Sequence, residues 1–135
     1  MKKLFNTRYS DGAFNVALLV LRLAAGGLLI PHGFSKLTNF SSMSHKFADP
    51  FHIGIKLSLS LTIFAELFCG VLIVLGLLTR LACIAPIIAM SVALFVAHKG
   101  HVFSDGEMAA LYLAMFITIL FLGPGRASVD GMIGK

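Results

Sequence analysis

The chain alternates between long apolar blocks and short polar breaks. Four blocks contain few charged residues: 13–33, 57–78, 81–98 and 108–123. Their lengths approach the roughly 20 apolar residues that an α-helix needs to cross about 30 Å of hydrocarbon. No block shows the strict apolar–polar alternation of a membrane β-strand. The pattern therefore predicts a single all-α domain over residues 1–135, an integral membrane bundle of four transmembrane helices.

The composition points to lipid as the solvent of these blocks. Of the 135 residues, 58% are hydrophobic and only 13% are charged. A soluble domain carries roughly 45–50% apolar and about 25% charged residues, and a small one has too little interior to bury the excess. The chain has a formal net charge of +5, but its basic residues are spread over the connections between the blocks. This distribution argues against a nucleic-acid partner, which would require a basic patch.

The basic residues in the connections predict the orientation, because cytoplasmic loops are enriched in Lys and Arg. On one side of the membrane we count Lys2, Lys3, Arg8, Arg80, Arg126 and Lys135, and on the other Lys36, Lys46, Lys56 and Lys99. We therefore expect a multi-pass protein of the plasma membrane with both termini in the cytoplasm.

Two charged residues lie inside the apolar blocks, Arg22 in the first and Glu66 in the second. At 1.5 Å per residue, Arg22 lies about 13 Å from the start of its block and Glu66 about 18 Å from the end of its own. Since consecutive spans are antiparallel, both heights are measured from the same membrane face. We expect the two side chains to pair near the midplane. Such a pair either holds the helices together or lines a ligand site.

A second polar group is expected at the outer rim. His32 and Lys36 lie one turn apart at the end of the first block, and His98 ends the third. Together with Glu66 they predict a cavity that suits a quinone headgroup or a small anion, although interfacial solvation is the favoured explanation of the two histidines. The histidines lack the compact spacing of a metal site, so we expect no metal and no covalently bound cofactor.

Small and aromatic residues form two further patterns. Alanines spaced by three and four residues predict a face for close helix approach, and phenylalanines in the first outer connection predict a segment in the membrane interface. The alanines are Ala82, Ala85, Ala89, Ala93 and Ala97, and the phenylalanines are Phe40, Phe47 and Phe51.

Several short motifs follow one another along the chain. They are Leu21-Arg22-Leu23 with Gly26, His32-Gly33 with Lys36-Leu37, Ala65-Glu66 with Gly70, Leu75-Gly76-Leu77-Leu78-Thr79-Arg80, and Gly123-Pro124-Gly125-Arg126-Ala127-Ser128-Val129-Asp130. In this order they resemble the DoxX family, small four-span membrane proteins of bacteria and archaea. The resemblance covers roughly residues 16–130. It places Arg22, His32, Lys36, Glu66, Arg126 and Asp130 in the family's polar positions, the last two as structural candidates. Ala127 departs from the family, where an aromatic is common.

The resemblance also implies a redox context, because namesake members accompany quinone-linked oxidoreductases. We expect an accessory or quinone-binding subunit of a membrane oxidoreductase, partnered by another membrane or peripheral subunit. A non-catalytic anchor or assembly partner and, with less support, a small-solute carrier or homo-oligomer remain alternatives. The sequence contains no haem-attachment motif, dinucleotide fingerprint or nucleophile elbow, which disfavours a self-sufficient enzyme and leaves catalytic residues unassigned.

Overall fold

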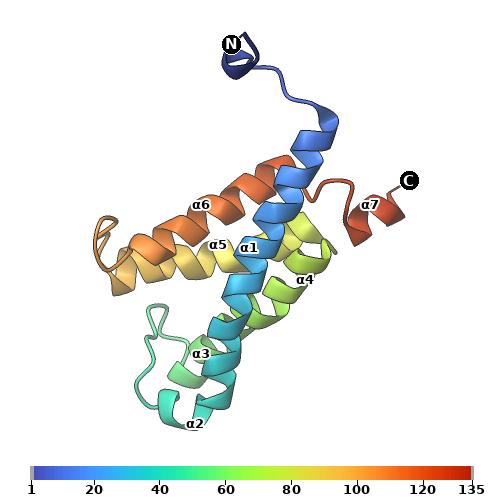
Figure 1. Ribbon diagram of the computed structural model, residues 1–135. Helices are drawn as coiled ribbons and strands as arrows, with labels where there is room; N and C mark the ends of the chain where they lie inside the picture. Colours follow the sequence, from blue (N-terminus) through green and yellow to red (C-terminus); the bar gives the residue numbers. More distant parts are fainter. Residues whose placement is uncertain (1, 135) are drawn as a thin grey trace.

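The computed structural model describes residues 2–134, which are all-helical and contain no strand (Figure 1). After a short 3-10 turn, η1 (Lys2–Phe5), the elements are α1 (Asp11–Thr38), α2 (Phe40–Met43), α3 (Ile55–Ile63), η2 (Phe64–Phe68), α4 (Cys69–Leu75), α5 (Thr79–Val92), η3 (Ala93–Ala97), α6 (Glu107–Leu122) and α7 (Val129–Ile133). The elements η2 and η3 are single π-helical turns, and each continues the helix before it.

Three continuous helical stretches are long and apolar enough to cross a membrane: Asp11–Thr38, Ile55–Leu75 and Thr79–Ala97. The fourth apolar helix, α6, is shorter. This confirms the predicted class, an all-α membrane bundle. Two ends differ from expectation. The first helix continues to Thr38 instead of ending at Gly33, and the second ends at Leu75, because Gly76 adopts a left-handed φ of 72° as its C-cap.

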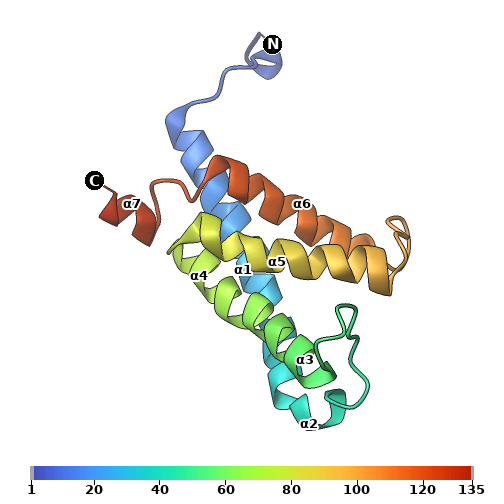
Figure 2. The same ribbon diagram turned by 180° about the vertical axis from the view of Figure 1, so that it is seen from behind.

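The helices form two antiparallel pairs. One pair is α1 against α3, η2 and α4, and the other is the hairpin of α5 and α6 (Figures 1 and 2). Both views show the hairpin starting at the α4 end and diverging from α3. The shared core includes Ala25, Leu29, Ile73, Cys83 and Phe116. Large apolar side chains cover the outside, as a lipid solvent requires.

The pairing of α1 with the second span depends on backbone contact at glycines. A Cβ on Gly26 would lie 2.7 Å from the Gly70 carbonyl oxygen, and one on Gly33 would lie 2.6 Å from the Leu67 nitrogen. No side chain fits at either position. Small residues that allow helix backbones to touch are typical of membrane helix interfaces, where packing replaces the hydrophobic effect.

We expect Gly33→Ala to lower the melting temperature in detergent, because the added methyl group must push α1 off η2 at a cost of roughly 1–3 kcal/mol. Gly27→Ala is the matched control, since a Cβ at Gly27 meets nothing within 4 Å. Thermal unfolding of both variants checks this. Equal melting temperatures for the two would contradict the proposed close contact.

Candidate functional site: an apolar pocket with one ion pair

The glycine contacts bring Lys36 of α1 to Glu66 of η2. The Lys36 Nζ donates to Glu66 Oε2 at 2.7 Å. Glu66 is only 4% exposed and lies eleven residues into the second span, about 16 Å from its start. Lys36 lies near the end of α1, and its long side chain reaches inward to the carboxylate. The sequence predicted both residues for the site, but not as partners of each other.

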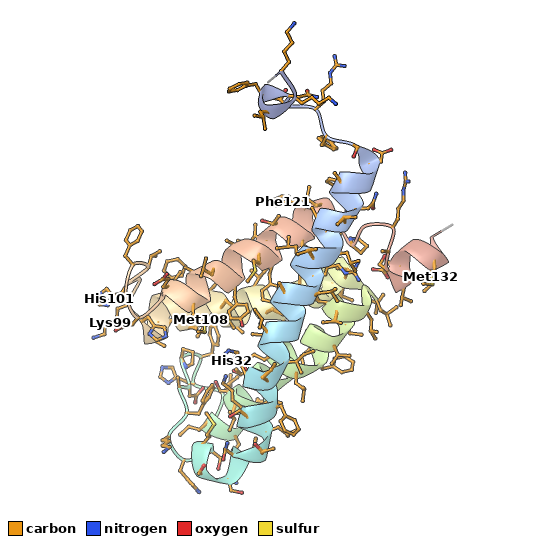
Figure 3. All side chains as sticks on the ribbon, viewed as in Figure 1. His32, Lys99, His101, Met108, Phe121 and Met132 are labelled. Carbon is orange, nitrogen blue, oxygen red and sulfur yellow. The ribbon has the colours of Figure 1, made fainter. Side chains whose placement is uncertain are left out.

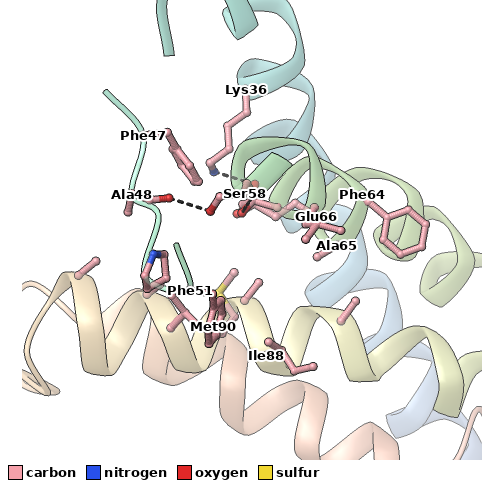
Figure 4. A pocket seen from close by; sticks show the side chains of 18 of the residues that line it. Lys36, Phe47, Ala48, Phe51, Ser58, Phe64, Ala65, Glu66, Ile88 and Met90 are labelled. Carbon is pink, nitrogen blue, oxygen red and sulfur yellow. Dashed lines mark hydrogen bonds and ion pairs between the residues drawn. The ribbon is translucent and has the colours of Figure 1, made fainter. Parts of the chain in front are cut away.

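This ion pair lines a cavity of about 420 Å³ between the two helix pairs (Figure 4). One wall comes from α1, α3 and η2 and contains Lys36 and Glu66. The facing wall comes from α5 and η3 and is apolar, including Ala89 and Met90. Both π-helical turns contribute to the lining, and such turns are frequent at functional sites.

The connection between α2 and α3 covers one part of the cavity with Phe47 and Phe51. Two sets of hydrogen bonds hold this connection in place. The Asp49 carboxylate accepts from the backbone N–H groups of residues 53 and 54, and the Ser58 hydroxyl donates to the Ala48 carbonyl at 2.7 Å. The sequence predicted an interfacial segment here and missed its role as a pocket wall.

The polar groups of the pocket retain capacity for a ligand. The hydroxyls of Ser58 and Thr62 already donate to backbone carbonyls. An ammonium group has three donors, and Lys36 uses one of them on Glu66. Glu66 Oε1 accepts no hydrogen bond from residues 2–134. The pocket thus offers two donors and one acceptor beside an apolar wall.

The two rim histidines lie elsewhere. His32 is exposed on α1, with its ring edge-on to Tyr112 of α6 at a centroid distance of 6.0 Å (Figure 3). His98 is half-buried at the end of η3. Neither belongs to the lining of the pocket. Of the four residues expected to share a cavity, the structure brings only Lys36 and Glu66 together.

The expected Arg22–Glu66 pair is wrong. Arg22 is 1% exposed and, within residues 2–134, donates only to backbone carbonyl oxygens. Its acceptors are Ile73 and Val74, both at 3.0 Å, Pro124 at 2.7 Å and Ala127 at 2.8 Å. Carbonyls at a helix C-terminus carry the negative end of the helix dipole, so the last turn of α4 is a favourable place for a cation.

The register of the two helices explains this error. The prediction treated the two helix ends as level, whereas the contact of Gly26 with Gly70 places Arg22 beside residues 73–74. Glu66 lies about eight residues further along, or roughly 12 Å. The two charged residues therefore occupy different levels, and each has its own partners.

The C-terminal segment also contacts the start of α5 and the start of α1. Asp130 accepts from the backbone N–H groups of Leu78 at 2.8 Å and Thr79 at 2.9 Å, and from the Thr79 hydroxyl at 2.8 Å. Helix α5 has no capping side chain or acidic first-turn residue of its own, so Asp130 provides its cap. Arg126 is largely exposed and lies 3.7 Å from Asp11. Neither Arg126 nor Asp130 lines the pocket.

The charge state of Asp130 follows from these bonds. Burial raises the pKa of its carboxyl, but the hydrogen bonds from Thr79 and Leu78 and the nearby Arg22 charge outweigh it. The net pKa therefore lies below the ordinary 3.8.

No three His, Cys, Asp or Glu side chains within residues 2–134 come together as a metal site requires.

The apolar helices, with an apolar pocket between them, define a multi-pass helical membrane protein. Residues 17–99 match the family model described as DoxX, and the chain belongs to the DoxX family. An uncharacterized protein of Haemophilus influenzae is 29% identical over 129 residues, covering 87% of this chain and 91% of the relative. No solved structure matches the chain significantly.

We expect Asp130→Asn to lower thermal stability at neutral pH and to flatten its dependence on acid. A depressed folded-state pKa contributes stability that is present above the ordinary value near 3.8 and is lost as the pH falls through the folded value. Melting temperatures in detergent between about pH 2 and 7 check this. Asp11→Asn is the control, because its carboxylate is 82% exposed and should contribute little. An Asp130 variant as acid-sensitive as the native protein would contradict the assigned role.

Proposed function

We propose that this chain is a quinone-binding accessory subunit of a membrane oxidoreductase complex. The observation that carries the proposal is the apolar pocket whose charged groups are Lys36 and Glu66. Ligand pockets are mostly apolar with a few convergent polar groups, and volumes of roughly 300–1,000 Å³ are usual. A pocket of about 420 Å³ bordered by membrane helices matches a lipid-soluble ligand with a small polar headgroup.

The free hydrogen-bonding groups match the two oxidation states of a quinone. When bound, the quinone would carry two electrons and two protons, with the electrons supplied by the partner oxidoreductase. The Lys36 ammonium would donate to a headgroup carbonyl oxygen. The unoccupied Oε1 of Glu66 would accept a hydrogen bond from a quinol hydroxyl, and this carboxyl group would exchange one of the two protons, the other being exchanged with water.

We place the protein in the plasma membrane with both termini in the cytoplasm. Asp130 contacts Thr79, and Arg126 contacts Asp11. These contacts support placing the 76–79 turn, the start of α1 and the C-terminal segment at the same end of the bundle. Arg80 and Arg126 then lie on the same side of the membrane as the N-terminal lysines, and the side with more basic residues is expected to be cytoplasmic. Lys135 lies outside the described residues.

Native mass spectrometry of the gently solubilised protein from its natural host tests the proposal directly. We expect a stoichiometric oxidoreductase subunit and one bound quinone. A bare oligomer carrying only phospholipid would overturn this proposal and favour the anchor or carrier alternatives.

We expect Glu66→Gln and Lys36→Ala to weaken quinone binding roughly tenfold or more, because each removes a charge-assisted hydrogen bond. Co-purification of the partner subunit should stay unchanged. Binding and co-purification are measured on the same preparation. Lys56→Ala is the matched control, since Lys56 is exposed at the start of α3 and outside the pocket. Loss of both quinone and partner would instead assign the ion pair to assembly.

A further inference from the structure

The alanine face of the third span lies on the pocket. From the sequence it was expected to contact another helix, but Ala85, Ala89, Ala93 and Ala97 all line the cavity. They recur every four residues, which places them in one row along α5 and η3. Their methyl groups are short, so this row projects little into the cavity from the helix opposite the ion pair.

Two occupants could use such a row, a helix of another chain or a flat ring. A helix with its side chains is about 10–12 Å in diameter and needs a long groove. The cavity holds about 420 Å³ and is partly closed by Phe47 and Phe51. A helix here would also seal Lys36 and Glu66 into an apolar contact, where charged groups are costly.

The wall that carries the ion pair independently favours a ligand. Glu66 is 4% exposed, borders the cavity and leaves Oε1 without a hydrogen bond from the described residues. A small molecule with a polar edge and a flat apolar face satisfies both walls at once. Its edge meets the ion pair while its face lies against the alanine methyls.

We propose that Ala89 and Ala93 form a stacking surface that selects a planar headgroup, and that they are specificity-determining residues of the pocket. This inference rests on the proposed quinone-binding function. Lys36 and Glu66 orient the ring through its oxygens, whereas the alanines limit its thickness. A longer side chain at either alanine would occupy the space of the ring and leave the ion pair intact.

The test is equilibrium binding of decylubiquinone to the purified full-length protein in lipid nanodiscs. Ala89→Leu and Ala93→Leu should weaken binding about tenfold or more, because even one extra methylene in an apolar pocket changes affinity by about that factor. Ala89→Val is a smaller step and should give an intermediate loss. Ala114→Leu on α6 is the matched control, since Ala114 is exposed and outside the pocket. Melting temperatures without ligand identify any variant that fails to fold.

The outcomes separate the two proposals. A graded loss from Val to Leu, with the Ala114 variant unchanged, supports the stacking surface. If the native protein binds, Lys36→Ala loses binding and the folded alanine variants bind normally, the stacking surface is overturned while the quinone function stands. If the native protein binds no decylubiquinone, both proposals fall.

Discussion

The other features of the structure depend on one constraint, the direct backbone contact between α1 and the second span. Gly26 meets Gly70, and Gly33 meets the backbone of Leu67, so the two helices can pack at only one register. In lipid the hydrophobic effect does not favour one helix contact over another, and close packing decides. This register places Arg22 beside the end of α4 and Lys36 beside Glu66.

The protein satisfies its two buried charged sites in different ways. Arg22 donates four of its five N–H groups to carbonyl oxygens of α4 and the C-terminal segment, and at 1% exposure it is closed to a ligand. Lys36 and Glu66 satisfy each other through a single bond and keep further hydrogen-bonding capacity. The first arrangement joins three parts of the fold, whereas the second is an ion pair on the wall of a cavity.

The divergence of the α5–α6 hairpin from α3 gives the cavity its shape (Figure 1). Both facing helices contain a π-helical turn at this level, with the Cys69 N–H bonded to the Phe64 carbonyl and the His98 N–H to the Ala93 carbonyl. A π-turn adds one residue to the helical repeat and so changes which side chains face inward beyond it. At η2 the turn contains Glu66 itself, and at η3 it begins at Ala93.

The sequence by itself determined the class of the protein and most of its helices. Long apolar blocks require helices in lipid, because the backbone polar groups must be satisfied within each segment. It also determined which polar residues are unusual, since Arg22 and Glu66 are costly at membrane depth.

Only the tertiary structure decided which of these residues meet. Pairing depends on helix register, and an error of two turns exchanges every partner along an interface. The role of the alanine row depended on the same packing, because a small-residue face serves equally for a helix or for a cavity. Likewise, nothing local to α5 shows that its cap comes from Asp130, fifty-one residues away from Thr79. The chain thus determines its helices locally, whereas the site depends on contacts between distant segments.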